Sequence, residues 1–338
     1  MRPRLLIGSY LQDDLVARIS DEVPEVEVVF RPDLLPTPRF ACDHWGVKRE
    51  LTGKQMDQWR GHLADAEIMF DFDWWEPRNW RKNCPKLTWI QASQAGVGAR
   101  AESLGHVDQQ VRITTAAGVH AKPLAEFALA GLLHFVRQIP EMENRKASQE
   151  WVSGSSQTLF GRKALIVGAG SIGREVAKTL SFFGVACDGT TRTAMDLGDP
   201  FRHSLSLETC DLARYDIVVL ACPLTEATIG MFSDQKISMM KPGALLVNLA
   251  RGQVIDQAAL IEALESGHLG GAVLDVAEPE PLPAGHALWD APNLILSPHT
   301  AANVDAENSR IVELFIRNLR RHISGEQFIN LYDPAFGY

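Results

Sequence analysis

The sequence lacks paired cysteines and long apolar runs, and these absences exclude several classes of protein. Its five cysteines are scattered along 338 residues, and no two of them form a C-x-x-C pair. We therefore expect no disulfide framework and no metal site, and a reducing, cytoplasmic environment. No stretch reaches the roughly 18 apolar residues of a membrane-spanning helix, and the first apolar run is too short for a secretion signal.

Runs of basic residues are also missing. Lysine and arginine total 33 against 42 aspartates and glutamates, so the formal net charge is -9. An acidic chain repels phosphate backbones, and we expect no nucleic-acid partner. The remaining composition is that of an ordinary globular protein, and its length favours two domains.

Short apolar strands alternate with helical segments, a pattern typical of α/β domains with parallel sheets covered by helices. In the first part of the chain, the expected strands are residues 4–10, 26–30, 66–72, 86–93 and 111–117. In the second part they are residues 163–170, 185–191, 215–222, 243–250, 271–276 and 293–299. Six strands separated by helices predict a doubly wound sheet in the second domain.

Helical patterns flank this second block. Residues 123–149 form one helical pattern, in which Pro140 is expected to kink or end the helix. Residues 151–162 are polar and contain glycine, as expected of a surface loop. Residues 309–325 predict an amphipathic helix that returns to the first domain.

The segment GAGSIG at residues 168–173 follows an expected strand and opens an expected helix. In that context Gly168 makes the tight turn, Gly170 lets the backbone approach a pyrophosphate, and Gly173 allows the helix to pack closely on the strand. Backbone N–H groups at the helix start, Ser171 and Ile172 included, would hold the phosphates. A plain turn is the alternative, but the strand before and the helix after favour a dinucleotide site.

Cofactor choice depends on the end of the next strand, where an acidic residue would bind the ribose 2'-hydroxyl of NAD. Asp188 is 20 residues beyond Gly168, but the strand is expected to continue past it through Gly189. Thr191 and Arg192 would then lie at the strand tip and suit the 2'-phosphate of NADP. Arg192 could equally be a solvated loop charge, so either cofactor is possible, with a slight preference for NADP.

Three further strands end in polar residues that lie at the ligand-binding edge of such a sheet. Arg251 would hold a carboxylate in bidentate geometry. His299 would exchange a proton with a carbonyl or hydroxyl oxygen, because imidazole titrates near neutral pH. Glu278 and Glu280 supply an acidic partner for the imidazole. Singly, each residue also fits a structural or surface role; together they predict hydride transfer beside a substrate carboxylate.

The sequence resembles the D-2-hydroxyacid dehydrogenase family, in particular its glyoxylate/hydroxypyruvate reductase-like branch. The resemblance rests on the segments GVHAKPLAEFALAGLL, VGAGSIGREVAKTLSFFG, ACPLTEATIGMF, MMKPGALLVNLARGQVIDQAALIEAL, GAVLDVAEPEPLP and SPHTA. It implies a Rossmann dinucleotide-binding domain at residues 117–302 and a flavodoxin-like substrate domain at residues 1–116 and 303–338. It also implies a homodimer.

The resemblance assigns roles to individual residues. It implies a catalytic triad of Arg251, Glu280 and His299, with family spacing selecting Glu280 over Glu278. Cofactor contacts are implied for Cys222, Pro223, Thr228, Ala250 and Asp275. The backbone N–H groups of Ala95 and Gly96 are implied to bind the substrate carboxylate, although the sequence departs from the family pattern directly afterwards, at GVGARAES.

Aromatic residues gather in FDFDWWEPRNW, residues 70–80. By analogy with the fold, Phe72, Trp74 or Trp75 would form an apolar wall against a substrate side chain, and Trp74 is our candidate. The alternative is that two of these rings are ordinary core or interface aromatics. Burial of one ring contributes a few kcal/mol at about 25 cal/mol per Å², enough to select among keto acids.

The predicted activity is NAD(P)-dependent hydride transfer between the nicotinamide and C2 of a 2-keto or 2-hydroxy acid. A second hypothesis is a dinucleotide-sensing interaction protein without physiological turnover, as in the corepressor relatives of this family. Such proteins retain the triad, so the motifs do not separate the two hypotheses.

Overall fold

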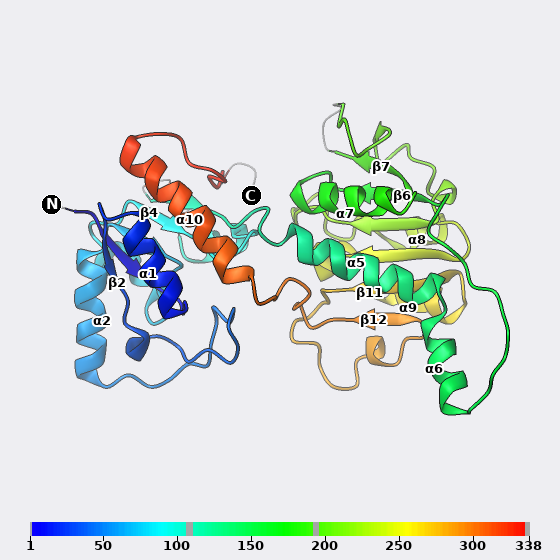
Figure 1. Ribbon diagram of the computed structural model, residues 1–338, viewed down its shortest axis with the longest axis horizontal. Coiled ribbons are helices and arrows are strands. Elements are labelled where there is room, and N and C mark those ends of the chain that lie inside the picture. The colour runs from blue at the N-terminus through cyan, green and yellow to red at the C-terminus, as the bar shows by residue number, and fades with distance from the viewer. Residues whose placement is uncertain (1, 106–110, 192–195, 335–338) are drawn as a thin grey trace. The chain divides into compact units, whose positions relative to one another are not determined.

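The computed structural model describes residues 2–105, 111–191 and 196–334, which form two compact units, each built around a parallel sheet (Figure 1). Unit 1 comprises Met1–His120 and Asn303–Tyr338, and unit 2 comprises Ala121–Ala302. The five cysteines are free thiols. Among the described residues, no helix combines the length and apolar character needed to cross a lipid bilayer.

The sheet of unit 1 has the strand order β2-β1-β3-β4-β5. Its strands β1 to β5 are Arg4–Ile7, Glu27–Val29, Ile68–Phe70, Trp89–Gln91 and Arg112–Thr114. Its helices are α1 (Asp13–Glu22), α2 (Gly53–Asp65), α3 (Trp80–Asn83), α4 (Gly98–Ser103) and α10 (Glu307–Ser324). This is the strand order of flavodoxin-like domains, as predicted.

Both faces of this sheet are covered. Leu5 and Ile7 of β1 pack on one face with residues of α1 and α10, while Leu6 packs on the other face with Trp59 and Leu63 of α2. Side chains alternate between faces along a strand, so a strand buried on both sides reads as a continuous apolar run. The last helix, α10, packs against α1 of unit 1 (Figure 1).

Residues 117–120, which the sequence analysis assigned to the dinucleotide-binding domain, group with unit 1. Polar contacts explain this placement. Asn330 donates a 2.7 Å hydrogen bond to the carbonyl oxygen of Ala117. His120 Nε2 lies 3.2 Å from a carboxylate oxygen of Glu307, and both side chains are largely buried.

The sheet of unit 2 has the order β12-β11-β10-β9-β6-β7-β8. Its strands β6 to β12 are Lys163–Val167, Ala186–Thr190, Ser204–Leu205, Ile217–Leu220, Ala244–Asn248, Leu269–Leu274 and Leu294–Leu296. Its helices are α5 (Ala121–Val136), α6 (Ile139–Ala147), α7 (Ser171–Phe182), α8 (Asp234–Ser238) and α9 (Gln257–Glu265). The order reverses between β6 and β9, as in a doubly wound dinucleotide-binding sheet, which confirms the predicted fold class.

Two details of unit 2 differ from the sequence prediction. The sheet has a seventh strand, β8, whose two residues are too few to produce a recognisable apolar run. The single helical pattern at residues 123–149 is two helices, because Gln138 between them has a left-handed φ of 56°. Pro140 lies in the first turn of α6, where a missing N–H costs nothing, and does not end α5.

Candidate active site

The strands of unit 2 end in one row, and this row positions the candidate site. Strand pairing aligns Leu296 with Leu274, Leu274 with Asn248, and Asn248 with Leu220. Leu220 in turn aligns with Val167. The residues that follow these strands therefore meet along one edge of the sheet, the edge at which open α/β sheets bind ligands.

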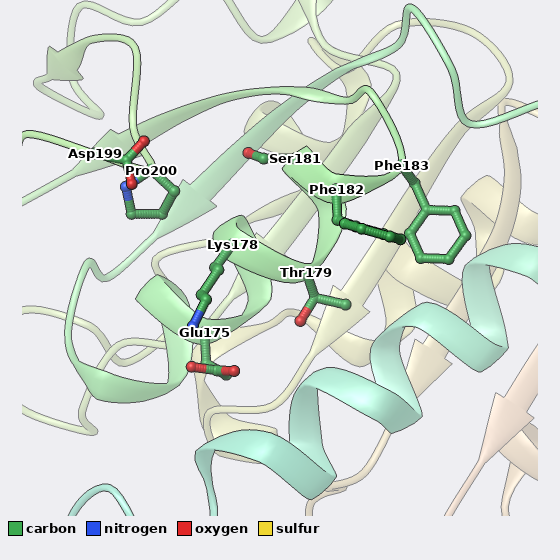
Figure 2. A pocket seen from close by; sticks show the side chains of 8 residues that line it. All are labelled: Glu175, Lys178, Thr179, Ser181, Phe182, Phe183, Asp199 and Pro200. Atoms are coloured by element: carbon green, nitrogen blue, oxygen red, sulfur yellow. The ribbon is translucent and has the colours of Figure 1, made fainter.

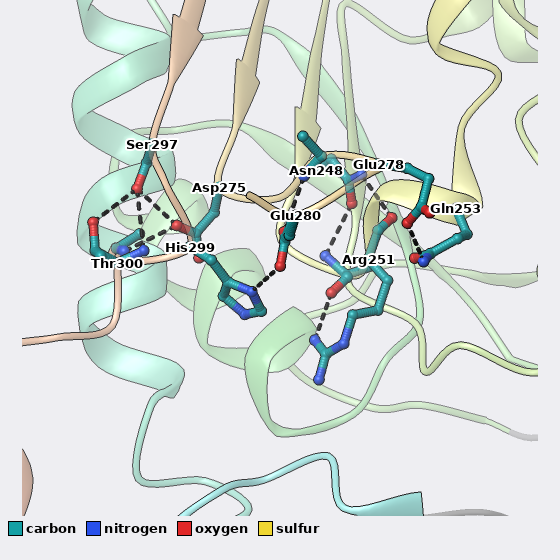
Figure 3. Close-up of polar contacts among 12 residues, drawn as sticks. Asn248, Arg251, Gln253, Asp275, Glu278, Glu280, Ser297, His299 and Thr300 are labelled. Atoms are coloured by element: carbon teal, nitrogen blue, oxygen red, sulfur yellow. Dashed lines mark hydrogen bonds and ion pairs between the residues drawn. The ribbon is translucent and has the colours of Figure 1, made fainter. Parts of the chain in front are cut away.

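The imidazole of His299 and the carboxylate of Glu280 form the central contact of this edge (Figure 3). His299 Nδ1 lies 2.9 Å from Glu280 Oε2. The other carboxylate oxygen of Glu280 accepts a 3.1 Å hydrogen bond from the backbone N–H of Ala277. A carboxylate held in this way fixes the orientation of the ring.

Charge interactions keep Glu280 ionised. Burial acts to raise the pKa of its carboxyl group. The hydrogen bond and charge of His299, the N–H of Ala277 and the charge of Arg251 lower this pKa by more, so it lies below its ordinary value. The side chains of His299 and Glu280 are 44% and 38% exposed. Glu280 is therefore ionised near neutral pH, and both side chains are accessible to a ligand.

His299 occupies a turn that a network around Asp275 stabilises (Figure 3). Its φ of 58° lies in the left-handed region, which is unfavourable for a residue with a side chain. Asp275 Oδ1 accepts hydrogen bonds from Ser297 Oγ at 2.8 Å and from the N–H of Ala301 at 2.9 Å. The backbone of His299 also donates to the carbonyl of Asp275 at 2.8 Å. The sequence analysis did not single out Ser297. Its position between the strand and Pro298 was the available signal that it belongs to this turn.

Asn248 plays the same part for the turn that carries Arg251. Its side-chain oxygen accepts from the N–H of Ala250 at 2.9 Å, and its amide donates to the carbonyl of Arg251 at 3.0 Å. Asn248 is 1% exposed, and a buried polar residue in an otherwise apolar strand was the signal that sequence analysis passed over. The guanidinium of Arg251 donates to the carbonyl oxygen of Ala250 at 2.7 Å, and among the described residues it forms no ion pair.

Gly252 brings the turns after β10 and β11 into direct contact. A Cβ atom at this position would lie 2.2 Å from the backbone carbon and oxygen of Ala277 and 2.6 Å from the N–H nitrogen of Glu278. Only glycine allows this approach. The geometry also separates the two candidate glutamates: Glu278 contacts Gln253 and Gln257, whereas Glu280 contacts His299.

The glycine-rich turn after β6 has the features of a pyrophosphate cradle. Gly168 has a φ of 99°, and a Cβ there would lie 2.7 Å from the backbone of Cys222. A Cβ on Gly173 would lie 2.0 Å from the carbonyl oxygen of Gly168, whereas Gly170 faces open space. Helix α7 begins at Ser171 after the N-cap Gly170, and within the described ranges no side chain caps its amino end. Its first N–H groups, including those of Ser171 and Ile172, are thus available to an anion.

The loop after β9 lies over this turn. Burial raises the pKa of the Cys222 thiol to about 11, so the thiol is neutral. Thr228 Oγ1 donates to the carbonyl of Pro223 at 2.8 Å and accepts from the N–H of Thr225 at 2.8 Å, which fixes the loop. Ala250, at the end of the neighbouring β10, is buried.

The end of β7 bears on the choice between NAD and NADP. The strand continues through Asp188 to Thr190, as expected from the sequence. The carboxylate of Asp188 is already engaged, because it lies 2.9 Å from His203 Nδ1 and accepts a 2.9 Å hydrogen bond from the hydroxyl of Tyr215. Thr191 follows the strand, and Arg192 lies outside the described residues.

The unit 1 candidates lie at the carboxyl ends of β3 and β4. Ala95 is half-buried and Gly96 is exposed, and their backbone N–H groups donate no hydrogen bond within the described part of the chain. Trp74 is 8% exposed. Phe72 belongs to the hydrophobic core of unit 1, and the partly buried Trp75 packs against it.

A hollow along α7 does not belong to this site. Figure 2 shows it lined by Lys178, Phe182 and neighbouring α7 residues, together with Asp199 and Pro200. It includes none of the predicted site residues. Within the described ranges, no three histidine, cysteine or acidic side chains gather in a way that could hold a metal ion.

Comparison with known proteins places this geometry among dehydrogenases. The family model described as D-isomer specific 2-hydroxyacid dehydrogenase, NAD binding domain, matches residues 129–301. The glyoxylate/hydroxypyruvate reductase A of Arabidopsis thaliana is 31% identical over 271 residues, which cover 79% of this chain and 81% of that protein. A glyoxylate reductase of Thermofilum pendens is 34% identical over 225 residues, which cover 64% of this chain and 66% of that protein.

A solved structure of the same family is similar along its whole length. A D-isomer specific 2-hydroxyacid dehydrogenase from Xanthobacter autotrophicus, in complex with NADPH and MES, is 27% identical and covers 100% of both chains with a TM-score of 0.77. The family match runs from α5 through the turn that carries His299. It therefore includes the glycine-rich turn and the three strand ends described above.

Proposed function

Since the chain belongs to the D-isomer specific 2-hydroxyacid dehydrogenase family, we propose that the edge of the unit 2 sheet reduces a 2-keto acid at C2 to the D-2-hydroxy acid. The chain is an NAD(P)-dependent oxidoreductase that acts on CH–OH donors. The observation that carries the proposal is the contact of His299 with Glu280 on the same sheet edge as the glycine-rich turn.

The residues have distinct roles in this proposal. The glycine-rich turn and the start of α7 would hold the pyrophosphate, and the bound reduced nicotinamide supplies the hydride. Arg251 would bind the substrate carboxylate and polarise the carbonyl. His299 would donate its Nε2 proton to the carbonyl oxygen in reduction and take it back in oxidation, while Glu280 orients the ring.

A steady-state screen of 2-keto acids with NADH and NADPH tests the proposal. Glyoxylate and hydroxypyruvate head the panel, because two relatives are named for their reduction. We expect turnover of at least one small 2-keto acid. Tight dinucleotide binding without turnover of any compound would contradict the enzyme proposal and favour the sensor hypothesis.

Replacement of Glu280 by glutamine is expected to change the pH profile of reduction. The lowered pKa of Glu280 means that His299 faces a negative charge throughout the neutral range. Without that charge the imidazolium is less stable, so the fall in kcat with rising pH should begin at lower pH. Profiles of wild type and Glu280→Gln between pH 5 and 9 measure this shift, with Glu278→Gln as the control. An unchanged profile for Glu280→Gln would show that Glu280 does not act on the proton donor.

For the cofactor, we propose a preference for NADP. Asp188 is occupied by His203 and Tyr215, which makes it a poor partner for a ribose 2'-hydroxyl. Thr191 and Arg192 remain the proposed ligands of the 2'-phosphate. Arg192→Ala should raise KM for NADPH by about tenfold or more, because a charge-assisted hydrogen bond to the 2'-phosphate is lost. KM for NADH should stay nearly unchanged, because NADH has no 2'-phosphate. An equal change for both cofactors would refute the assignment.

In unit 1, we propose that the N–H groups of Ala95 and Gly96 bind the substrate carboxylate and that Trp74 contributes to substrate selection. The homodimer and the cytoplasmic location expected from the sequence also remain proposals. Sedimentation of the purified chain would show whether it is a homodimer.

A further inference from the structure

One arginine of unit 1 is enclosed by aromatic rings. The guanidinium carbon of Arg100, on α4, lies 4.8 Å from the ring centroid of Trp45, 4.7 Å from that of Phe72 and 4.8 Å from that of Trp74. Trp45 and Trp74 are themselves in edge-to-face contact, with centroids 5.1 Å apart. Aromatic faces stabilise a cation without neutralising its charge.

This cluster contains hydrogen-bond donors that lack acceptors. In the described part of the chain, Arg100 forms no ion pair, and its buried Nη1 has no hydrogen-bond partner. The buried indole Nε1 of Trp74 has none either. Buried donors are almost always paired in folded proteins, so two such groups beside an unneutralised charge indicate a missing acceptor.

The cluster lies where its fold binds ligands. Phe72 and Trp74 follow β3, and Arg100 follows β4, the parallel neighbour of β3. Trp45 belongs to the long connection after β2 and is 52% exposed. These residues therefore gather at the carboxyl edge of the unit 1 sheet, and Arg100, near the start of α4, follows the Ala95–Gly96 segment in the chain.

The connection that carries Trp45 is held in place. The carboxylate of Asp43 accepts hydrogen bonds from the N–H groups of Arg39 and Gly46 and from the Arg39 guanidinium. These contacts outweigh the effect of burial and lower the pKa of Asp43 to about 2. Trp45 is thus presented to Arg100 by an ordered turn.

We propose that Arg100, with Trp74, binds a second carboxylate on the substrate, so that the preferred substrates are dicarboxylic 2-keto acids. Stacking on ring faces leaves the edge of a guanidinium as its donor surface, and that edge matches a carboxylate. The indole N–H supplies a further donor. This inference rests on the proposed function and identifies its substrate class.

Matched pairs of keto acids test it. We compare 2-oxopentanedioate with 2-oxopentanoate, and 2-oxobutanedioate with 2-oxobutanoate, which differ within each pair only in the terminal group. Wild type should have the higher kcat/KM for the dicarboxylate. Arg100→Met should lower kcat/KM for the dicarboxylate by about 10- to 100-fold, mainly through KM, because a hydrogen-bonded charge pair is lost. Monocarboxylates should change less than about threefold, since no such pair exists for them.

Controls separate this role from a structural one. Arg81 also stacks on a tryptophan, Trp80, at 4.6 Å, and Arg81→Met should leave the selectivity unchanged. Arg100→Lys retains the charge and should recover part of the preference. Equal losses on both members of a pair, or a wild-type preference for monocarboxylates, would overturn the inference while leaving the reductase activity established. Absence of turnover with every keto acid would instead overturn the proposed function.

Discussion

Replacement of His299 by alanine is expected to lower kcat by about 100-fold or more with the fold intact. The imidazole is the proton donor in the proposed reaction, and neither Glu280 nor Arg251 can replace it. Glu280 is ionised and faces the other ring nitrogen, while a guanidinium does not release its proton. The side chain is 44% exposed, so its removal leaves no large buried cavity.

The measurement combines kcat on the best keto acid with a fluorescence titration of dinucleotide binding. Binding should stay within a few-fold of wild type, because the glycine-rich turn does not involve His299. His299→Asn is the companion variant, since asparagine tolerates the φ of 58° at this position. His134→Ala, at a partly exposed position of α5, is the matched control. Activity near wild type in both His299 variants would remove this residue from the mechanism.

Gly252→Ala is expected to lower kcat/KM by about 100-fold although this residue has no chemical group to contribute. Its Cβ would overlap the backbone of Ala277, 2.2 Å away, so the turn carrying Arg251 and the turn leading to Glu280 must separate. Displacement of catalytic groups by about 1 Å can cost this much. The free energy of unfolding should fall by about 1–3 kcal/mol, as in other overpacked sites.

Thermal unfolding and dinucleotide titration accompany the kinetics of this variant. Dinucleotide affinity should remain near wild type, because Gly168 and Gly173 are unchanged. Gly61→Ala is the control: it lies in α2 with no atom within 4 Å of its added Cβ, and there alanine should be neutral or stabilising. An active Gly252→Ala enzyme would show that the two turns need not touch for catalysis.

The sequence alone predicted the α/β class and the two parallel sheets, because strands buried on both faces leave apolar runs between helical segments. It also predicted that Gly168, Arg251 and His299 follow directly after such strands, and in the structure they come after β6, β10 and β12. Local patterns did not reveal β8, which has two residues, or the break between α5 and α6 at Gln138.

Other features depend on contacts between residues far apart in the chain. Three contacts of this kind join distant segments. Tyr215 binds the carboxylate of Asp188, and Gly252 approaches the backbone of Ala277. The rings of Trp45 and Phe72 lie against the guanidinium of Arg100. A one-dimensional pattern records which side chains a segment exposes, whereas packing determines which of them meet. The sequence by itself therefore determined the fold class and the candidate chemistry. The tertiary structure decided which glutamate contacts the histidine and which rings surround Arg100, because these contacts join segments far apart in the chain.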